Sequence, residues 1–168
     1  MIETERVFMD FIISLFNSHY DLYIRLVVAT FIGLLIGLER AIKHKPAGIR
    51  THILVCLGST LAMSLSTLNQ GPYMDPMRLA AQVISGIGFL GAGVIWLDKD
   101  NIKRGLTTAA NLWITACVGL TIGYGAYDLA IVTVLLMFIA MNLPKVIEKM
   151  GILPPRDKGH DESDSDGE

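Results

Sequence analysis

The sequence predicts an all-α membrane protein, built as a bundle of five transmembrane helices preceded by an N-terminal amphipathic helix. Its 168 residues are 52% hydrophobic and only 18% charged, far from the averages of soluble domains. Five apolar runs approach the length that crosses the hydrocarbon of a bilayer, and the basic residues between them are unevenly distributed. We therefore divide the chain into an amphipathic segment (1–21), a five-helix membrane domain (22–144) and a short acidic tail (145–168).

The first segment carries apolar residues at helical spacing, such as Val7, Phe11 and Leu15, with polar residues on the opposite side. This pattern is typical of a helix that lies in the membrane surface. It is not a signal peptide, because its first residues are acidic and no cleavage site follows. The end of the tail is acidic and has no apolar anchor, so we expect it to be disordered.

Five spanning helices follow from the apolar runs. We place them at 22–38, 53–68, 79–97, 106–124 and 129–143. Small residues recur along four of them, which favours close approach of neighbouring helices. The glycines that we expect to pack helices are Gly33, Gly37, Gly58, Gly86, Gly88, Gly91, Gly93, Gly119 and Gly123.

The third run is the most unusual, because four of those glycines lie in it, and we predict that it is the centre of the bundle. Residues 86–91 also match the dinucleotide-binding pattern G-x-G-x-x-G. That pattern needs a preceding strand and an acid about 20 residues further on, and here the glycines lie within one apolar segment. We interpret them as packing residues. Four small-residue faces exceed the needs of a five-helix monomer, so we predict a homo-oligomer, most simply a two-fold dimer.

The loops indicate the orientation. If the runs alternate across the membrane, eleven Lys and Arg residues fall on one side and three on the other. Basic residues concentrate in cytoplasmic loops, so the N-terminus is predicted outside and the C-terminus in the cytoplasm.

Five stretches resemble signatures of the MgtC/SapB family of bacterial inner-membrane proteins. They are L-E-R (38–40), P-A-G-I-R-T-H (46–52), D-P-M-R (75–78), S-G-I-G-F-L-G-A-G-V-I (85–95) and G-L-T-T-A-A-N-L-W (105–113). The resemblance covers about residues 22–143. It implies a multi-pass protein of the inner membrane that supports magnesium homeostasis and growth when magnesium is scarce, and in some pathogens survival inside macrophages. Family members are also tied to control of the F-type ATP synthase. Longer members carry a C-terminal domain resembling ACT domains, and we expect this chain to be the short form.

The candidate functional residues are polar groups at helix ends or near helix interiors. They are Glu39, Arg40, Arg50, Thr51, Asp75, Arg78, Gln82, Ser85, Thr107, Thr108 and Asn111. Residues 39, 40 and 50 either anchor the interface or form an ion-paired gate or partner-binding site, in which Glu39 approaches Arg50. Asp75 and Arg78 are spaced to pair on one helical turn, or serve as a helix-start acid and an interfacial cation. The uncharged groups either bond between helices or line a polar cavity, and His52 is expected at the interface.

The function that we expect is that of a non-enzymatic regulator of another membrane protein, with transport of magnesium or another small ion as the alternative. The sequence contains no nucleophile–base constellation that would suggest an enzyme. Magnesium favours carboxylate ligands, and the acids near the spans, such as Glu39, Asp75 and Asp128, do not lie deep within them. A metal site is therefore not assigned. We expect no cofactor, magnesium at most as ligand or signal, and partners in the lipid bilayer and its proteins but no nucleic acid.

Overall fold

The computed structural model describes residues 5, 9, 19–68, 75–99 and 102–151. Most of the predicted amphipathic helix and most of the acidic tail lie outside these residues. The chain divides into two compact units, residues 1–131 and 132–168. The described part of the first unit contains α2 (Tyr20–Ile42), α3 (Ile49–Leu68), α4 (Met77–Gly93), α5 (Leu106–Tyr124) and the start of α6 (Tyr127–Lys149). The second unit holds the rest of α6.

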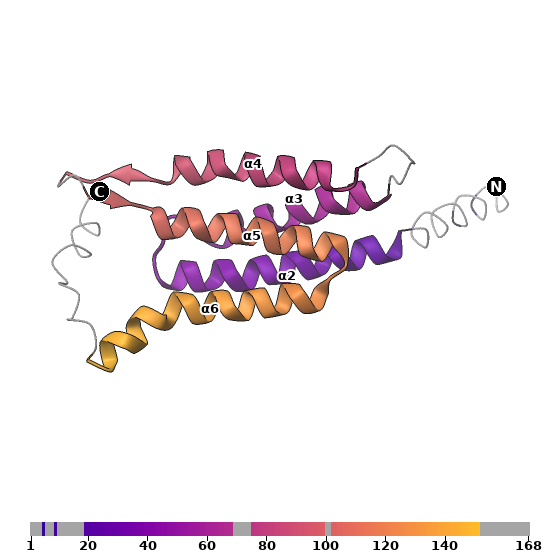
Figure 1. Ribbon diagram of the computed structural model, residues 1–168. Coiled ribbons are helices and arrows are strands. Elements are labelled where there is room, and N and C mark those ends of the chain that lie inside the picture. The colour runs from indigo at the N-terminus through magenta and orange to yellow at the C-terminus, as the bar shows by residue number, and fades with distance from the viewer. Residues whose placement is uncertain (1–4, 6–8, 10–18, 69–74, 100–101, 152–168) are drawn as a thin grey trace. The chain divides into compact units, whose positions relative to one another are not determined.

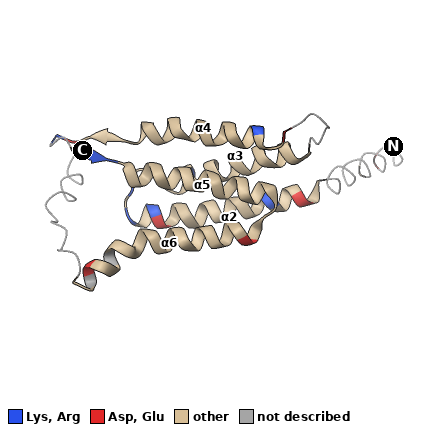
Figure 2. Ribbon diagram, viewed as in Figure 1, with Lys and Arg blue, Asp and Glu red and all other residues tan. Residues whose placement is uncertain are grey.

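The described residues confirm an all-α membrane protein. The four helices α2, α3, α5 and α6 are long and apolar enough to cross a membrane, and α4 is a shorter apolar helix of 17 residues. In the first unit, charged residues lie near the helix ends (Figure 2). This distribution follows from the cost of placing charge in hydrocarbon.

Helix α3 occupies the middle of the first unit and packs against α2, α4 and α5 (Figure 1). Glycines allow these close contacts. An added Cβ at Gly33 or Gly37 would lie 2.8 or 2.6 Å from the Cα of Ile53 or Ile49 on α3. On the other side of α3, a Cβ at Gly123 would lie 2.5 Å from the Thr60 carbonyl oxygen. Backbones this close exclude any larger residue, so these glycines do pack helices.

The prediction that the third apolar run is the centre of the bundle is wrong within this chain. On α4 only Ile87 and Gly91 are buried, and a Cβ at Gly86, Gly88 or Gly93 would meet nothing within 4 Å. The glycines concentrate there, but the helix lies at the edge of the unit, beside α3 and α5 (Figure 1).

A Cβ added at Gly58 would also meet nothing within 4 Å, so Gly58 does not have its predicted packing role within this chain. The face of α3 that packs is a different one, marked by the buried residues Cys56, Ser59, Thr60 and Met63.

The predicted helix 79–97 ends early, because a β-hairpin replaces its last turn. Strand β1 (Trp96–Leu97) pairs antiparallel with β2 (Lys103–Arg104), with Trp96 opposite Arg104. The Asp98 carboxylate accepts a 2.8 Å hydrogen bond from Arg104 Nε and closes the hairpin. Gly105 follows at φ +86°, against the Val94 carbonyl, where a side chain has no room. This glycine lets the chain turn from β2 directly into α5.

Candidate functional site

Five polar side chains meet at the end of the first unit where α2 ends and α3 and α5 begin. They are Glu39, Arg40, His52, Thr108 and Asn111, which we call the Arg40 cluster. They come from three separate sequence motifs, at 38–40, 46–52 and 105–113. Helix packing therefore brings together residues that are up to 72 positions apart in the sequence (111 minus 39).

Arg40 is the most unusual member of the cluster. Its side chain is almost fully buried, with 2% of the residue exposed. The guanidinium Nη2 donates a 3.0 Å hydrogen bond to Thr108 Oγ1, and Nε has no hydrogen-bond partner among the described residues. A buried guanidinium with one neutral acceptor loses hydration that this single bond does not replace.

Glu39, the neighbouring acid, does not compensate Arg40 directly. Consecutive helical residues point in different directions, and Glu39 forms its ion pair with Lys43 one turn further along α2. Its second carboxylate oxygen is buried without a hydrogen-bond partner among the described residues. The predicted approach of Glu39 to Arg50 is not what the structure shows, because Arg50 and Thr51 are exposed on the first turn of α3.

His52 is a member that the sequence analysis placed wrongly, at the interface. It is fully buried, its Nδ1 lies 2.8 Å from the Gly48 carbonyl oxygen, and its Nε2 lies 3.5 Å from Asn111 Nδ2. The signal was available, since His52 is four residues before Cys56 and eight before Thr60 on the packing face of α3. Thr108 and Asn111 thus bond between helices, whereas the neighbouring Thr107 is exposed.

A second polar group, Asp75, Arg78 and Gln82, lies around the start of α4, which is at the opposite end of the unit (Figure 1). Asp75 and Arg78 are both exposed, and the structure records no ion pair between these two described residues. Asp75 Oδ1 instead accepts a 2.8 Å hydrogen bond from the Met77 amide, so Asp75 caps the helix start. Gln82 and Ser85 are exposed on α4.

Arg25 fills a role at this same end that the sequence analysis missed. Its Nη1 donates a 2.5 Å hydrogen bond to the carbonyl oxygen of Gly123, in the last turn of α5, and its Nη2 pairs with Asp21. A cation at a helix C-terminus satisfies carbonyls that have no partner within the helix. Arg25 therefore joins α2 to α5.

Apolar helices packed through glycine, with polar clusters at their two ends, define a multi-span α-helical membrane protein. The MgtC family model matches residues 26–150, and the chain belongs to this family. The MgtC family resemblance seen in the motifs is thereby confirmed.

Three curated relatives illustrate the similarity. The chain is 40% identical over 140 residues to protein SapB of Bacillus subtilis, a match that covers 78% of this chain and 60% of the relative. It is 44% identical over 118 residues to the putative magnesium transporter YhiD of Escherichia coli K12, covering 66% and 54%. It is 46% identical over 114 residues to protein MgtC of Brucella abortus, covering 68% and 47%. The matches thus span about half to three fifths of these relatives. No solved structure matches.

Proposed function

We propose that the protein is a non-enzymatic regulator in the bacterial inner membrane that supports magnesium homeostasis and adaptation to low magnesium. Two observations link the proposal to magnesium: the family resemblance and the name of the relative YhiD, a putative magnesium transporter. Regulation, rather than conduction, is supported by one observation, the buried guanidinium of Arg40 between α2 and α5.

The positive charge of Arg40 opposes conduction of a cation through the helix bundle. A route for a divalent cation between the helices of one chain would pass this end of the bundle. A guanidinium stays protonated in proteins and repels cations strongly where water is excluded, as fixed arginines do in pores that reject cations. Beyond it, the buried core of the described residues contains hydroxyl groups, such as those of Thr60, Ser64 and Thr115, but no carboxylate, the ligand that magnesium favours. Both features oppose magnesium passage through a single copy.

The proposed target is another membrane protein, and the family resemblance names the F-type ATP synthase as a candidate. The glycine faces of α2 and α5 are used within the chain, because Gly33, Gly37, Gly119 and Gly123 lie against α3. We propose that the protein acts as a regulator without catalysing a reaction, and that it requires no cofactor of its own.

We further propose a homo-oligomer that assembles through α4. Helix faces that contact lipid carry large apolar residues, as on α2, where Val27, Phe31 and Leu35 are exposed. The exposed surface of α4 also has large residues, such as Phe89 and Leu90, but Ser85, Gly86 and Gly93 are exposed among them. Small and polar residues pack better against a protein helix than against lipid tails. A two-fold axis beside α4 would cover this face.

The experiment that tests the proposed function is magnesium flux into proteoliposomes, combined with growth. A deletion strain complemented with the protein should grow in low magnesium, while the purified protein should give no magnesium uptake above that of empty liposomes. Saturable uptake by the purified protein would overturn the regulator and establish the transporter. Failure of the gene to restore growth would remove the link to magnesium.

Transport remains the second candidate function. It is favoured by the name of the relative YhiD, a putative magnesium transporter, which is 44% identical to this chain over 118 residues. An oligomer could place a path between copies, where Arg40 does not lie. The same flux assay decides between the two functions.

A further inference from the structure

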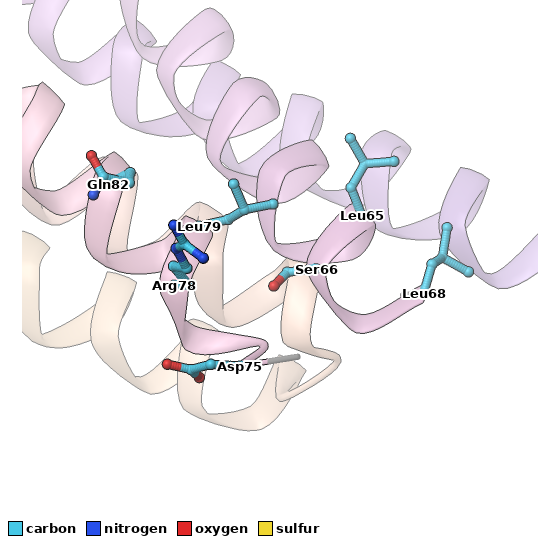
Figure 3. Close-up of a pocket in the computed structure, with 7 residues that line it drawn as sticks. All are labelled: Leu65, Ser66, Leu68, Asp75, Arg78, Leu79 and Gln82. Carbon is cyan, nitrogen blue, oxygen red and sulfur yellow. The ribbon is translucent and has the colours of Figure 1, made fainter. Parts of the chain in front are cut away.

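A cavity of about 760 Å³ lies where α3 ends and α4 begins, at the end of the first unit opposite the Arg40 cluster. Leu65, Ser66 and Leu68 line it from α3, and Arg78, Leu79 and Gln82 line it from α4, with Asp75 beside them (Figure 3). The Ser66 hydroxyl donates a hydrogen bond to the Pro76 carbonyl. This bond joins the end of α3 to the start of α4.

The polar part of the cavity carries one negative and one positive group that do not neutralise each other. Asp75 uses Oδ1 to cap the Met77 amide at 2.8 Å, which leaves its second oxygen for another donor. The Arg78 side chain starts three residues later and is exposed, with the Gln82 amide one turn further along. The lining therefore has no net charge but two separated full charges, which matches a zwitterion better than a simple anion or cation.

The rest of the cavity is apolar. Leu65, Leu68 and Leu79 are 51%, 49% and 45% exposed, although each is a large hydrophobic side chain. α3 is long and apolar enough to span the membrane and ends at Leu68. Its last turn consequently lies where hydrocarbon meets headgroups. A ligand here can place a charged group on α4 and a hydrocarbon chain on the leucines at the same time.

We propose that this cavity binds a phospholipid with a phosphoethanolamine headgroup. The phosphate accepts hydrogen bonds from Arg78 and the Gln82 amide, and the ammonium donates to the free oxygen of Asp75. The acyl chain lies on Leu65, Leu68 and Leu79. A primary ammonium is required, because the quaternary amine of phosphatidylcholine has no N–H to donate. Phosphatidylglycerol has the phosphate but no cation for Asp75.

The test is competitive lipid retention by the full-length protein, measured by native mass spectrometry from mixed detergent–lipid micelles. Phosphatidylethanolamine, phosphatidylglycerol and phosphatidylcholine with identical acyl chains are supplied in equal amounts. The wild type should retain phosphatidylethanolamine about tenfold better than either competitor, the effect expected of one charge-assisted hydrogen bond. Equal retention of all three lipids would overturn the proposal without the use of any variant.

Two variants separate the roles of the charges. Arg78→Gln should weaken retention of all three lipids alike, because each presents a phosphate. Asp75→Asn keeps a side chain that can cap the helix and should abolish only the preference for phosphatidylethanolamine. Lys103→Gln removes an exposed cation in the hairpin at the other end of the unit and should change nothing. Wild-type retention in Arg78→Gln together with an unchanged lipid preference in Asp75→Asn, both with wild-type thermal unfolding, would overturn the assignment.

A soluble competitor tests whether the ligand is a lipid or a free molecule with the same charged groups. Glycerophosphoethanolamine has the same charged groups but no acyl chain. It should fail to displace the lipid at concentrations where phosphatidylethanolamine does. Equal competition would show that the leucines do not contribute and would overturn a lipid ligand. The binding assay is independent of growth in low magnesium, so its failure and that of the proposed function are distinguishable.

Discussion

Arg40 and Thr108 are 68 residues apart in the sequence, and their side chains meet at 3.0 Å, from guanidinium Nη2 to hydroxyl Oγ1. The contact joins the end of α2 to the start of α5, and the buried His52 of α3 lies in the same cluster. An aliphatic side chain in place of either residue would break this hydrogen bond of the guanidinium. The pair is therefore the most direct test of what the cluster does.

We predict that Thr108→Val destabilises the protein. The variant keeps the shape of the side chain but leaves the Arg40 guanidinium without this acceptor, at a cost of about 1–3 kcal/mol. The thermal unfolding midpoint in detergent should fall clearly. Thr107→Val is the matched control, because Thr107 is exposed on the same turn. Equal midpoints for the two variants would show that the hydrogen bond contributes little.

Arg40→Met should separate stability from function. Replacing a buried charge with an apolar side chain of similar length is often neutral or stabilising. We expect the variant to accumulate in the membrane and to unfold no earlier than the wild type, yet to fail to support growth in low magnesium. Complementation together with immunoblotting of membranes measures both properties. Growth at the wild-type rate would assign Arg40 a purely structural role.

Two glycines give opposite expectations for the same substitution. In Gly119→Ala the new Cβ would meet the Cys56 carbonyl oxygen and lie 2.8 Å from Ser59 Cβ, so we expect a loss of about 1–3 kcal/mol from overpacking. In Gly88→Ala the new methyl meets nothing within 4 Å, and helix propensity improves by roughly 0.5–1 kcal/mol. Thermal unfolding in detergent compares the two. A tolerated Gly119→Ala would contradict the packing of α5 on α3.

Cross-linking tests the proposed oligomer. Phe89 lies in the middle of the exposed face of α4 and is 84% exposed, whereas Phe31 lies on the exposed apolar face of α2. In a background with Cys56→Ala and Cys117→Ala, Phe89→Cys should give a disulfide-linked dimer after oxidation of native membranes. Phe31→Cys should remain a monomer under the same conditions. Dimers at Phe31 but not at Phe89 would place the contact elsewhere, and monomers in both would remove it.

Reporter fusions test the orientation. With the basic loops in the cytoplasm, fusions after Lys99 and Glu168 should give a cytoplasmic signal, and a fusion after Gln70 should give an external one. The pattern is decisive because these positions fall in different predicted loops and in the tail. A cytoplasmic signal after Gln70 would exclude this orientation.

Apolar runs predict where helices lie better than they predict how helices pack. The observed α2, α3 and α5 contain the predicted spans, because an apolar run longer than about 16 residues has few alternatives in a membrane. The end of α4 was missed because Trp96 and Leu97 are as apolar as the helix before them. The hairpin depends on residues after the run: Arg104, which contacts Asp98, Ile102, whose carbonyl oxygen accepts from the Asp98 amide, and Gly105 with its positive φ.

The sequence predicted only part of the candidate site, because it shows which residues are polar but not which helix faces pack. Arg40, Thr108 and Asn111 were selected as polar residues near apolar runs, and the structure brings them to one end of the bundle. His52 was missed because its burial depends on which face of α3 packs. The sequence offered a competing small-residue face through Gly58, which proves to be exposed. Composition does not distinguish a glycine against a neighbouring backbone from one in open space.

The length of α4 has a consequence for the bilayer itself. Its 17 residues rise roughly 26 Å, short of the roughly 30 Å of a typical hydrocarbon layer, and the hairpin that follows cannot extend the helix. In the proposed oligomer, the lipid chains that still contact α4 must shorten or tilt, whereas those beside the 23-residue α2 need not. The expected mismatch with the bilayer is therefore larger beside α4 than beside α2. A change in membrane thickness should therefore affect the position of α4 more than that of the longer helices.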